Sequence, residues 1–293
     1  MQLKLFGMEM KPLPRVSQAF VRTSSVICVV ILLSVAVELA STAYHSATYQ
    51  RSSFMGRKEV EDYENRVENV TGMDRWDRTM YYWTNNLSVA GYRIIFTLWY
   101  VGVSAEVFQA YIVGIVNTFW YHEAELSPFR AAIEFHGIFE MTGFFIITAI
   151  TARLAWNLWK GLAFMMSYRK NVKRLIKKYR GRIKEILGDY LILVSIGILL
   201  IFLAAPIEAY ISPSIWMTFS SAPLLPYIFL VAVALLYLAV FFAQFRGWEM
   251  MKKDLKKIRT DVKSLLKGKF VPAHLSLLMF ILFTIPAIIV ILM

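Results

Sequence analysis

Residues 133–148 read I-E-F-H-G-I-F-E-M-T-G-F-F-I-I-T, which places the ionisable pair of His136 and Glu140 in a predominantly apolar run. A spacing of four residues puts both side chains on one face of a helix, one turn apart. Gly143 continues this face and leaves room for a neighbouring helix. Because an ionisable group at membrane depth is costly, the pair predicts a functional site with partners on other segments.

The composition predicts an integral membrane protein. Hydrophobic residues make up 58% of the 293 residues and gather in long blocks, so the chain has enough apolar sequence for several membrane spans. The net charge of +12 is concentrated in two runs, 169–184 and 246–269, which flank spanning segments and therefore indicate orientation rather than nucleic-acid binding. The single cysteine, Cys28, excludes an intrachain disulfide.

The apolar blocks predict an all-α, polytopic transmembrane bundle of about six to seven membrane segments. The count is open at residues 87–121, which are apolar for about twice the length of one helix. They predict two short helices joined by a tight turn, with Glu106 at the turn, or a split or re-entrant pair of half-helices. A single long tilted crossing, with a re-entrant loop in residues 131–159, fits equally. The remaining predicted spans are 23–44, 131–159, 191–211, 227–245 and 271–293.

Basic residues before the first span place the N-terminus in the cytoplasm and residues 45–84 outside, as a helical insert. Both basic runs then lie in the cytoplasm, and their apolar stripes predict two amphipathic helices on the anionic lipid of the inner leaflet. The expected organisation is a membrane core at 1–213, followed by a C-terminal membrane extension at 214–293 that contains the basic helix 246–269.

The same topology places several polar side chains at one depth. His136 and Glu140 lie ~10 to 16 Å below the outer boundary at the rise of an α-helix, and Glu38 and Glu208 lie near the outer ends of their own spans. Pro206 interrupts the helix beside Glu208 and frees backbone carbonyls. One imidazole with two carboxylates is an acceptable ligand set for a divalent metal, so a metal ion would be held by His136, Glu140 and Glu208. The predicted intramembrane polar site in the outer leaflet comprises His136, Glu140, Glu208, Glu38, Asn85 and Asn86.

Two motifs resemble those of the stage II sporulation protein M family of membrane proteins. They are H-G-x-x-E at residues 136–140 and A-x-x-E-A-x-x-x-P at residues 205–213, separated by a basic stretch. The resemblance covers roughly residues 24–213, and it departs from the family at Phe135, where a proline usually precedes the His-Gly pair. It implies a membrane protein like the namesake, which anchors a complex with peptidoglycan-degrading partners during engulfment. Members also occur in organisms without sporulation or peptidoglycan, so the shared chemistry is more general.

Three functions fit these features. The first is a membrane scaffold or anchoring component of a cell-envelope complex, whose polar cluster holds the helices in register. The second is a channel or transporter that uses the polar site to pass an ion, a proton or a small solute. The third is a metal-dependent intramembrane enzyme, which the lack of an H-E-x-x-H motif and of an evident nucleophile disfavours. The expected setting is the cell membrane, as a homodimer that contacts anionic lipid and envelope proteins but no nucleic acid.

Overall fold

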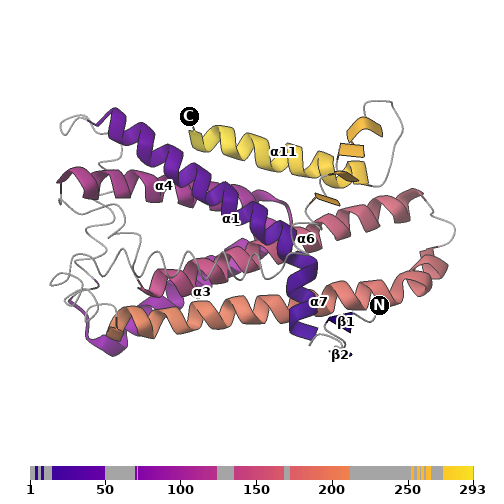
Figure 1. Ribbon diagram of the computed structural model, residues 1–293, viewed down its shortest axis with the longest axis horizontal. Coiled ribbons are helices and arrows are strands. Elements are labelled where there is room, and N and C mark those ends of the chain that lie inside the picture. The colour runs from indigo at the N-terminus through magenta and orange to yellow at the C-terminus, as the bar shows by residue number, and fades with distance from the viewer. Residues whose placement is uncertain are drawn as a thin grey trace.

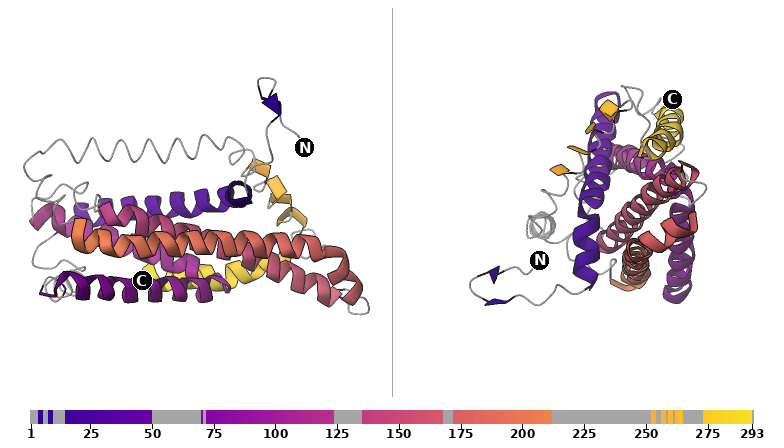
Figure 2. Two further views of the ribbon diagram at one scale, coloured as in Figure 1. Left: turned by 90° about the horizontal axis from the view of Figure 1, so that it is seen from below. Right: turned by 90° about the vertical axis from the view of Figure 1, so that its right-hand side faces the viewer.

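The protein is a bundle of long helices in the computed structural model (Figure 1). Helices from both halves of the chain lie side by side in this bundle, as the end view also shows (Figure 2). The structure describes residues 4–5, 8–9, 15–49, 70, 72–123, 135–167, 172–211, 252–253, 256–257, 259–260, 262–264 and 273–292.

Helices make up the described secondary structure apart from one short hairpin, in which β1 (Lys4–Leu5) pairs antiparallel with β2 (Met8–Glu9). The all-α class that the sequence predicts is therefore confirmed. The main helices are α1 (Arg15–Ala47), α3 (Arg75–Thr97), α4 (Val101–Glu123), α6 (Phe135–Ser167), α7 (Val172–Pro206), the π-helical turn η2 (Ile207–Ile211) and α11 (Ala273–Leu292).

Three described helices are long and apolar enough to cross a membrane: Arg15–Ala47, Phe139–Met166 and Ile176–Tyr210. The shortest of them has 28 residues. This corresponds to ~42 Å of helix, which exceeds the ~30 Å of hydrocarbon in a typical bilayer. These helices make the chain a membrane protein, and each is long enough to extend beyond the apolar layer.

Residues 87–121 lie in a helical hairpin rather than in a single tilted crossing. α3 begins directly after Asp74, whose carboxylate accepts hydrogen bonds of 2.8 and 2.9 Å from two backbone N–H groups of the first turn. The helix ends at Thr97, and a tight turn with Tyr100 at a φ of 63° leads into α4. Glu106 lies in the second turn of α4, not at the connection between the helices where the sequence predicts it.

The helices run back and forth between the two ends of the bundle. α6 packs along α7, α1 packs along α4, and α11 lies beside α4 and α6. α1, α4, α7 and α11 begin at the end of the bundle where α3 and α6 finish (Figure 1). Segments far apart in the sequence are thereby brought into contact.

α7 differs from the expected arrangement because the first basic run and the following span form one helix. It continues from Val172 to Pro206 without a break, since no proline occurs before its last residue. The predicted span at 227–245 lies outside the described residues, as do 50–69 of the predicted outer insert and most of the predicted basic helix at 246–269.

The closest crossing of α6 and α7 is made by two glycines that face each other. A Cβ atom placed on Gly143 would lie 2.7 Å from the carbonyl oxygen of Gly197 and 2.7 Å from Ile201. A Cβ atom on Gly197 would lie 2.6 Å from Ile147. Small residues allow such close packing in a membrane, where lipid removes the hydrophobic drive for helix association. Gly143 therefore makes room for a neighbour, as the sequence predicts.

We expect Gly143→Ala to lower the free energy of unfolding by about 1–3 kcal/mol, because the added methyl group overpacks this crossing. Gly161→Ala on the same helix is the matched control, since a Cβ atom there meets nothing within 4 Å. SDS titration of the purified protein measures both changes. Equal stability of the two variants would contradict the close crossing.

Candidate functional site

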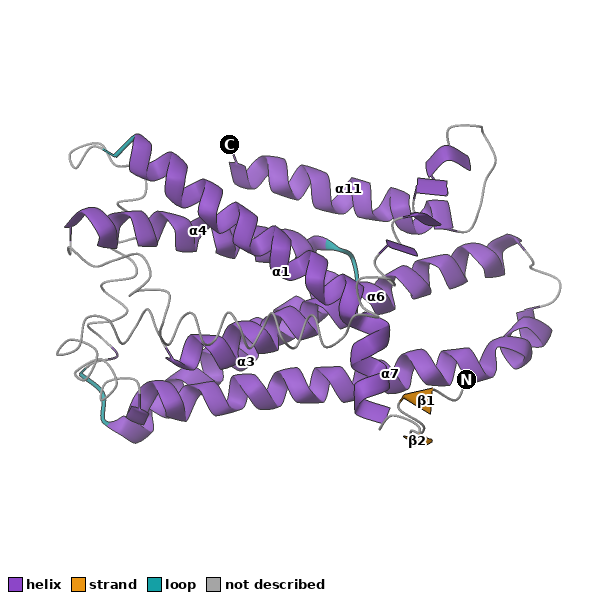
Figure 3. Ribbon diagram, in the orientation of Figure 1, coloured by secondary structure: helices purple, strands orange, loops and turns teal. Residues whose placement is uncertain are grey.

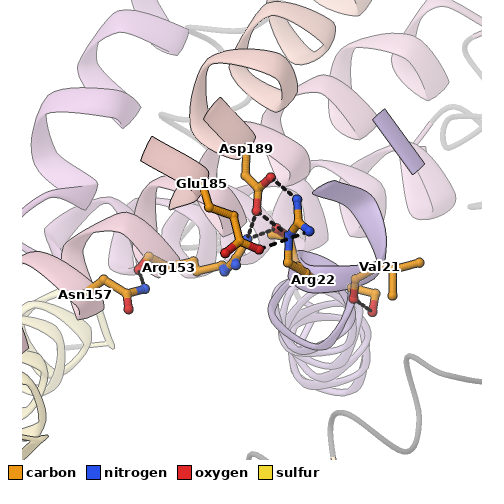
Figure 4. Close-up of polar contacts among 8 residues, drawn as sticks. Val21, Arg22, Arg153, Asn157, Glu185 and Asp189 are labelled. Atoms are coloured by element: carbon orange, nitrogen blue, oxygen red, sulfur yellow. Dashed lines mark hydrogen bonds and ion pairs between the residues drawn. The ribbon is translucent and has the colours of Figure 1, made fainter. Parts of the chain in front are cut away.

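An aspartate on α7 holds three helices together (Figure 4). The side chain of Asp189 is 1% exposed, and it accepts hydrogen bonds of 2.7 and 2.5 Å from Nε and Nη2 of Arg22 on α1. Arg153 of α6 donates to the same carboxylate at 3.0 Å and to the hydroxyl of Thr23 at 2.9 Å. Glu185, one turn before Asp189, pairs with Arg22 at 3.1 Å. We call these residues the Asp189 cluster.

The Asp189 cluster is balanced in charge, because two arginines face two carboxylates. The two hydrogen bonds from Arg22 match the geometry in which guanidinium binds carboxylate most strongly. The net stability of such a buried pair is small, but removal of one partner leaves an uncompensated charge. The cluster therefore fixes the register of α1, α6 and α7 rather than merely adding to stability.

A second buried ion pair joins α3, α4 and α6. The guanidinium of Arg93 donates to Glu106 Oε1 and to Gln109 Oε1, and the Thr148 hydroxyl donates to Glu106 Oε1 at 2.6 Å. The side chains of Arg93 and Glu106 are 4% and 2% exposed. Arg93 also lies over the ring of Phe144, 4.0 Å from its centroid, which adds a cation–π contact. We call these five residues the Arg93 cluster.

The Arg93 cluster lies between the levels of Trp83 and Trp159, and on α3 it is five residues from Leu98, whose carbonyl oxygen accepts from Trp159. On α3 it is ten residues from Trp83, and on α6 Thr148 is eleven residues from Trp159. These intervals correspond to ~15 and ~17 Å of helix. Trp83 and Trp159 lie toward opposite ends of the bundle, and tryptophan is typical of the two membrane interfaces. The cluster is therefore deeper than the outer-leaflet layer in which the sequence predicts a site.

Among the residues that the sequence predicts for the site, Glu140 lies near the Arg93 cluster. It acts electrostatically on the Arg93 guanidinium, so the face of α6 that carries the His-Gly-x-x-Glu motif approaches α3. Asn86 is buried on α3 and accepts a hydrogen bond of 3.1 Å from the exposed Asn85. The Nδ2 atom of Asn86 has no hydrogen-bond partner among the described residues.

Pro206 frees a backbone carbonyl, as the sequence predicts, but a side chain of another helix donates a hydrogen bond to it. Proline has no N–H to donate to the carbonyl of Phe202, four residues earlier. The Nε1–H of Trp83 donates to this oxygen at 2.7 Å, and the two rings stack with centroids 4.3 Å apart. The freed carbonyl therefore ties α3 to α7. Glu208 follows in η2, which contacts both α3 and α6.

The remaining predicted residues lie on α1 and at the start of α6. Glu38 is on the stretch of α1 that crosses Gly114 of α4, where a Cβ atom on the glycine would lie 2.8 Å from the Glu38 carbonyl oxygen. His136 is in the first turn of α6, and its side chain lies outside the described part of the structure. In that part, no group of three or more His, Cys, Asp and Glu side chains could hold a metal ion. A metal site that includes His136 stays a prediction.

Arg93 and Asp189 are absent from the residues that the sequence predicts for the site. The signal for Arg93 was present, since it is a charged residue within the apolar stretch 87–121. Asp189 lies between a basic run and an apolar span, where an acidic residue reads as part of the membrane boundary. Its burial depends on Arg22, which is 167 residues away in the sequence.

Long apolar helices joined by buried ion pairs define the class of this chain as an integral membrane protein of the helical type. Residues 19–213 match the model of the family described as Stage II sporulation protein M, which is about two thirds of the chain. The chain belongs to this family, and the resemblance seen in its motifs is confirmed. No curated protein and no solved structure matches the chain.

We expect Asp189→Asn to lower the free energy of unfolding by about 3–5 kcal/mol, because two arginines lose their buried anion. Glu185→Gln is the matched control on the same helix, and its side chain is 47% exposed, so we expect a loss below about 1 kcal/mol. SDS titration measures both. If Asp189→Asn were as stable as Glu185→Gln, the register of the three helices would not depend on the Asp189 cluster.

Proposed function

We propose that the protein is a membrane scaffold that anchors a cell-envelope complex. The observation that carries this proposal is the ionic linkage of five helices. The buried carboxylates of Asp189 and Glu106 are each held by an arginine from another helix. Together the two clusters join α1, α3, α4, α6 and α7. Such linkage favours a rigid frame over a conformational cycle. The family supports the same role, because its namesake acts as an anchor.

The proposed scaffold is a polytopic protein of the cell membrane with its N-terminus in the cytoplasm. The alternating directions of the described helices support a chain that crosses repeatedly, and the excess of Lys and Arg at one end supports the orientation. The shorter helices α3, α4 and α11, which pack against the three long ones, support a count of six to seven spans. A homodimer is part of the proposal, since symmetric pairing is the commonest assembly.

We also propose that the polar residues toward the outer end form a binding site within the scaffold. The mutual contacts of α3, α6 and η2 support this, because these elements carry Asn86, Glu140 and Glu208. Asn85, His136 and Glu38 complete the proposed set. Its occupant is a polar group of a partner or a divalent cation bound by the carboxylates.

One observation favours a second function, the passage of protons or cations. The Oε2 atom of Glu106 is buried and has no hydrogen-bond partner among the described residues. An open and largely apolar cavity of about 240 Å³ lies beside the Arg93 cluster, with Arg93 and Gln109, but not Glu106, in its lining. A buried carboxylate oxygen near a cavity is the kind of group that binds and releases protons in membrane transporters.

Reconstitution in liposomes separates the two functions. For a scaffold we expect proton flux, followed with an internal pH-sensitive dye under an imposed potential, to equal that of protein-free liposomes. When the protein is gently solubilised from its own membrane, it should also elute from a size-exclusion column as an assembly heavier than a dimer of the 33.8 kDa chain. Flux in the wild type that disappears in Glu106→Gln would instead establish passage.

The orientation is tested by cysteine labelling in a Cys28→Ser background. We expect Gly72→Cys, in the segment before α3, to react with an impermeant maleimide in intact cells. Lys178→Cys on the basic part of α7 should react only after permeabilisation. The reverse pattern would overturn the proposed orientation.

A further inference from the structure

Residues 176–185 of α7 form a helical stretch with few contacts to the rest of the bundle, among them those of Tyr179 with Phe164 and of Glu185 with Arg22. Each of residues 176–185 is exposed, which distinguishes this stretch from residues 186–206, where buried, half-buried and exposed residues alternate. The stretch is strongly basic, and its exposed cations are Lys177, Lys178, Arg180, Arg182 and Lys184.

An apolar stripe runs along this basic stretch. Ile176, Tyr179, Ile183 and Leu187 are 49%, 40%, 42% and 45% exposed. The first three are separated by three and four residues, which is the spacing of the a and d positions of a coiled coil. Tyr179 touches Phe164 of α6 at 5.9 Å between ring centroids and still keeps this exposure. The stripe is thus suited to pack against another helix.

This stretch extends past the end of the helical hairpin formed by α3 and α4. The Nε1–H of Trp159 donates to the carbonyl oxygen of Leu98 at 3.1 Å, so α6 passes the turn of that hairpin at Trp159. Phe164, which contacts Tyr179, lies beyond this level, and the ends of α6 and α7 extend past the turn of the hairpin (Figure 3). α7 has 35 residues. Its ~52 Å length exceeds the ~30 Å hydrocarbon layer by several turns.

We propose that residues 176–187 of α7 are a docking surface for an acidic amphipathic helix of a partner protein. The charge of the stretch selects an acidic partner, and the apolar stripe selects a helical one. A second copy of the stretch is disfavoured because its cations would repel those of the first. A lipid surface is disfavoured because the stretch continues the axis of the membrane-spanning helix. The stretch therefore stands upright on the membrane and does not lay its apolar stripe on the leaflet. This inference rests on the proposed scaffold function and names the class of partner.

The test uses the full chain in nanodiscs of neutral phosphatidylcholine and a fluorescent helical peptide of three heptads, with Leu at a and d and Glu elsewhere. We expect saturable binding that weakens with salt and is at least tenfold tighter than that of the same peptide with Lys in place of Glu. Ile176→Ser with Ile183→Ser should weaken binding at least tenfold without changing the charge, because both side chains belong to the exposed stripe.

Two matched charge reversals control for non-specific electrostatic attraction between the acidic peptide and the basic protein. Lys177→Glu with Lys178→Glu should abolish binding, whereas Lys252→Glu with Lys253→Glu should leave it unchanged, since all four lysines are exposed. Equal loss in both pairs, or no effect of the two serine substitutions, would overturn the docking surface.

Lipid is the competing occupant, and a fluorophore on Ile183→Cys in the Cys28→Ser background detects it. We expect no quenching by brominated lipid when the nanodiscs contain 30% phosphatidylserine. Strong quenching would mean that the stripe lies on anionic lipid and would overturn the proposal. Proton flux lost in Glu106→Gln, together with specific peptide binding, would reject the scaffold function and leave the docking surface intact.

Discussion

The structure depends on the pairing of the charges that its described helices bury, which are those of Arg93, Glu106 and Asp189. Asp189 is the clearest case, because its carboxylate would be too costly to bury without Arg22 and Arg153. These two arginines come from different helices, so the pairing specifies which faces of α1, α6 and α7 meet. In a bilayer, where apolar contact between helices is no better than contact with lipid, such polar pairing and close small-residue packing select the arrangement.

α6 connects the two ionic clusters. It supplies Arg153 to one and Thr148, with the ring of Phe144, to the other. One residue before Phe144 it crosses α7 at the closely packed pair of Gly143 and Gly197. Because these contacts follow one another along a single helix, a shift of α6 would disturb all of them together. The frame is therefore cooperative, which suits an anchor for other proteins, and it leaves the basic stretch of α7 to extend beyond it.

The sequence predicted much of this fold, and less of its polar interior. The membrane class and the family were accessible from apolar block length and from two motifs, whereas block length left the helical hairpin at 87–121 as one of several alternatives. The role of Glu106 could not be predicted, because its position relative to the turn depends on where α3 ends. The carbonyl freed by Pro206 was predicted, but α7 passes into the π-helical turn η2 without a break. The donor to that carbonyl, Trp83, lies 119 residues away in the sequence. No periodicity in one segment indicates a partner at such a distance.

The sequence by itself determined that this chain is a helical membrane protein of the Stage II sporulation protein M family, since length, apolarity and local motifs are properties of single segments. Only the tertiary structure decided which charges neutralise each other. Arg93 with Glu106, and Asp189 with Arg22 and Arg153, are matched by the rotation and register of whole helices. Helix faces are set by packing between segments, and the low dielectric around them makes each such match a strict requirement.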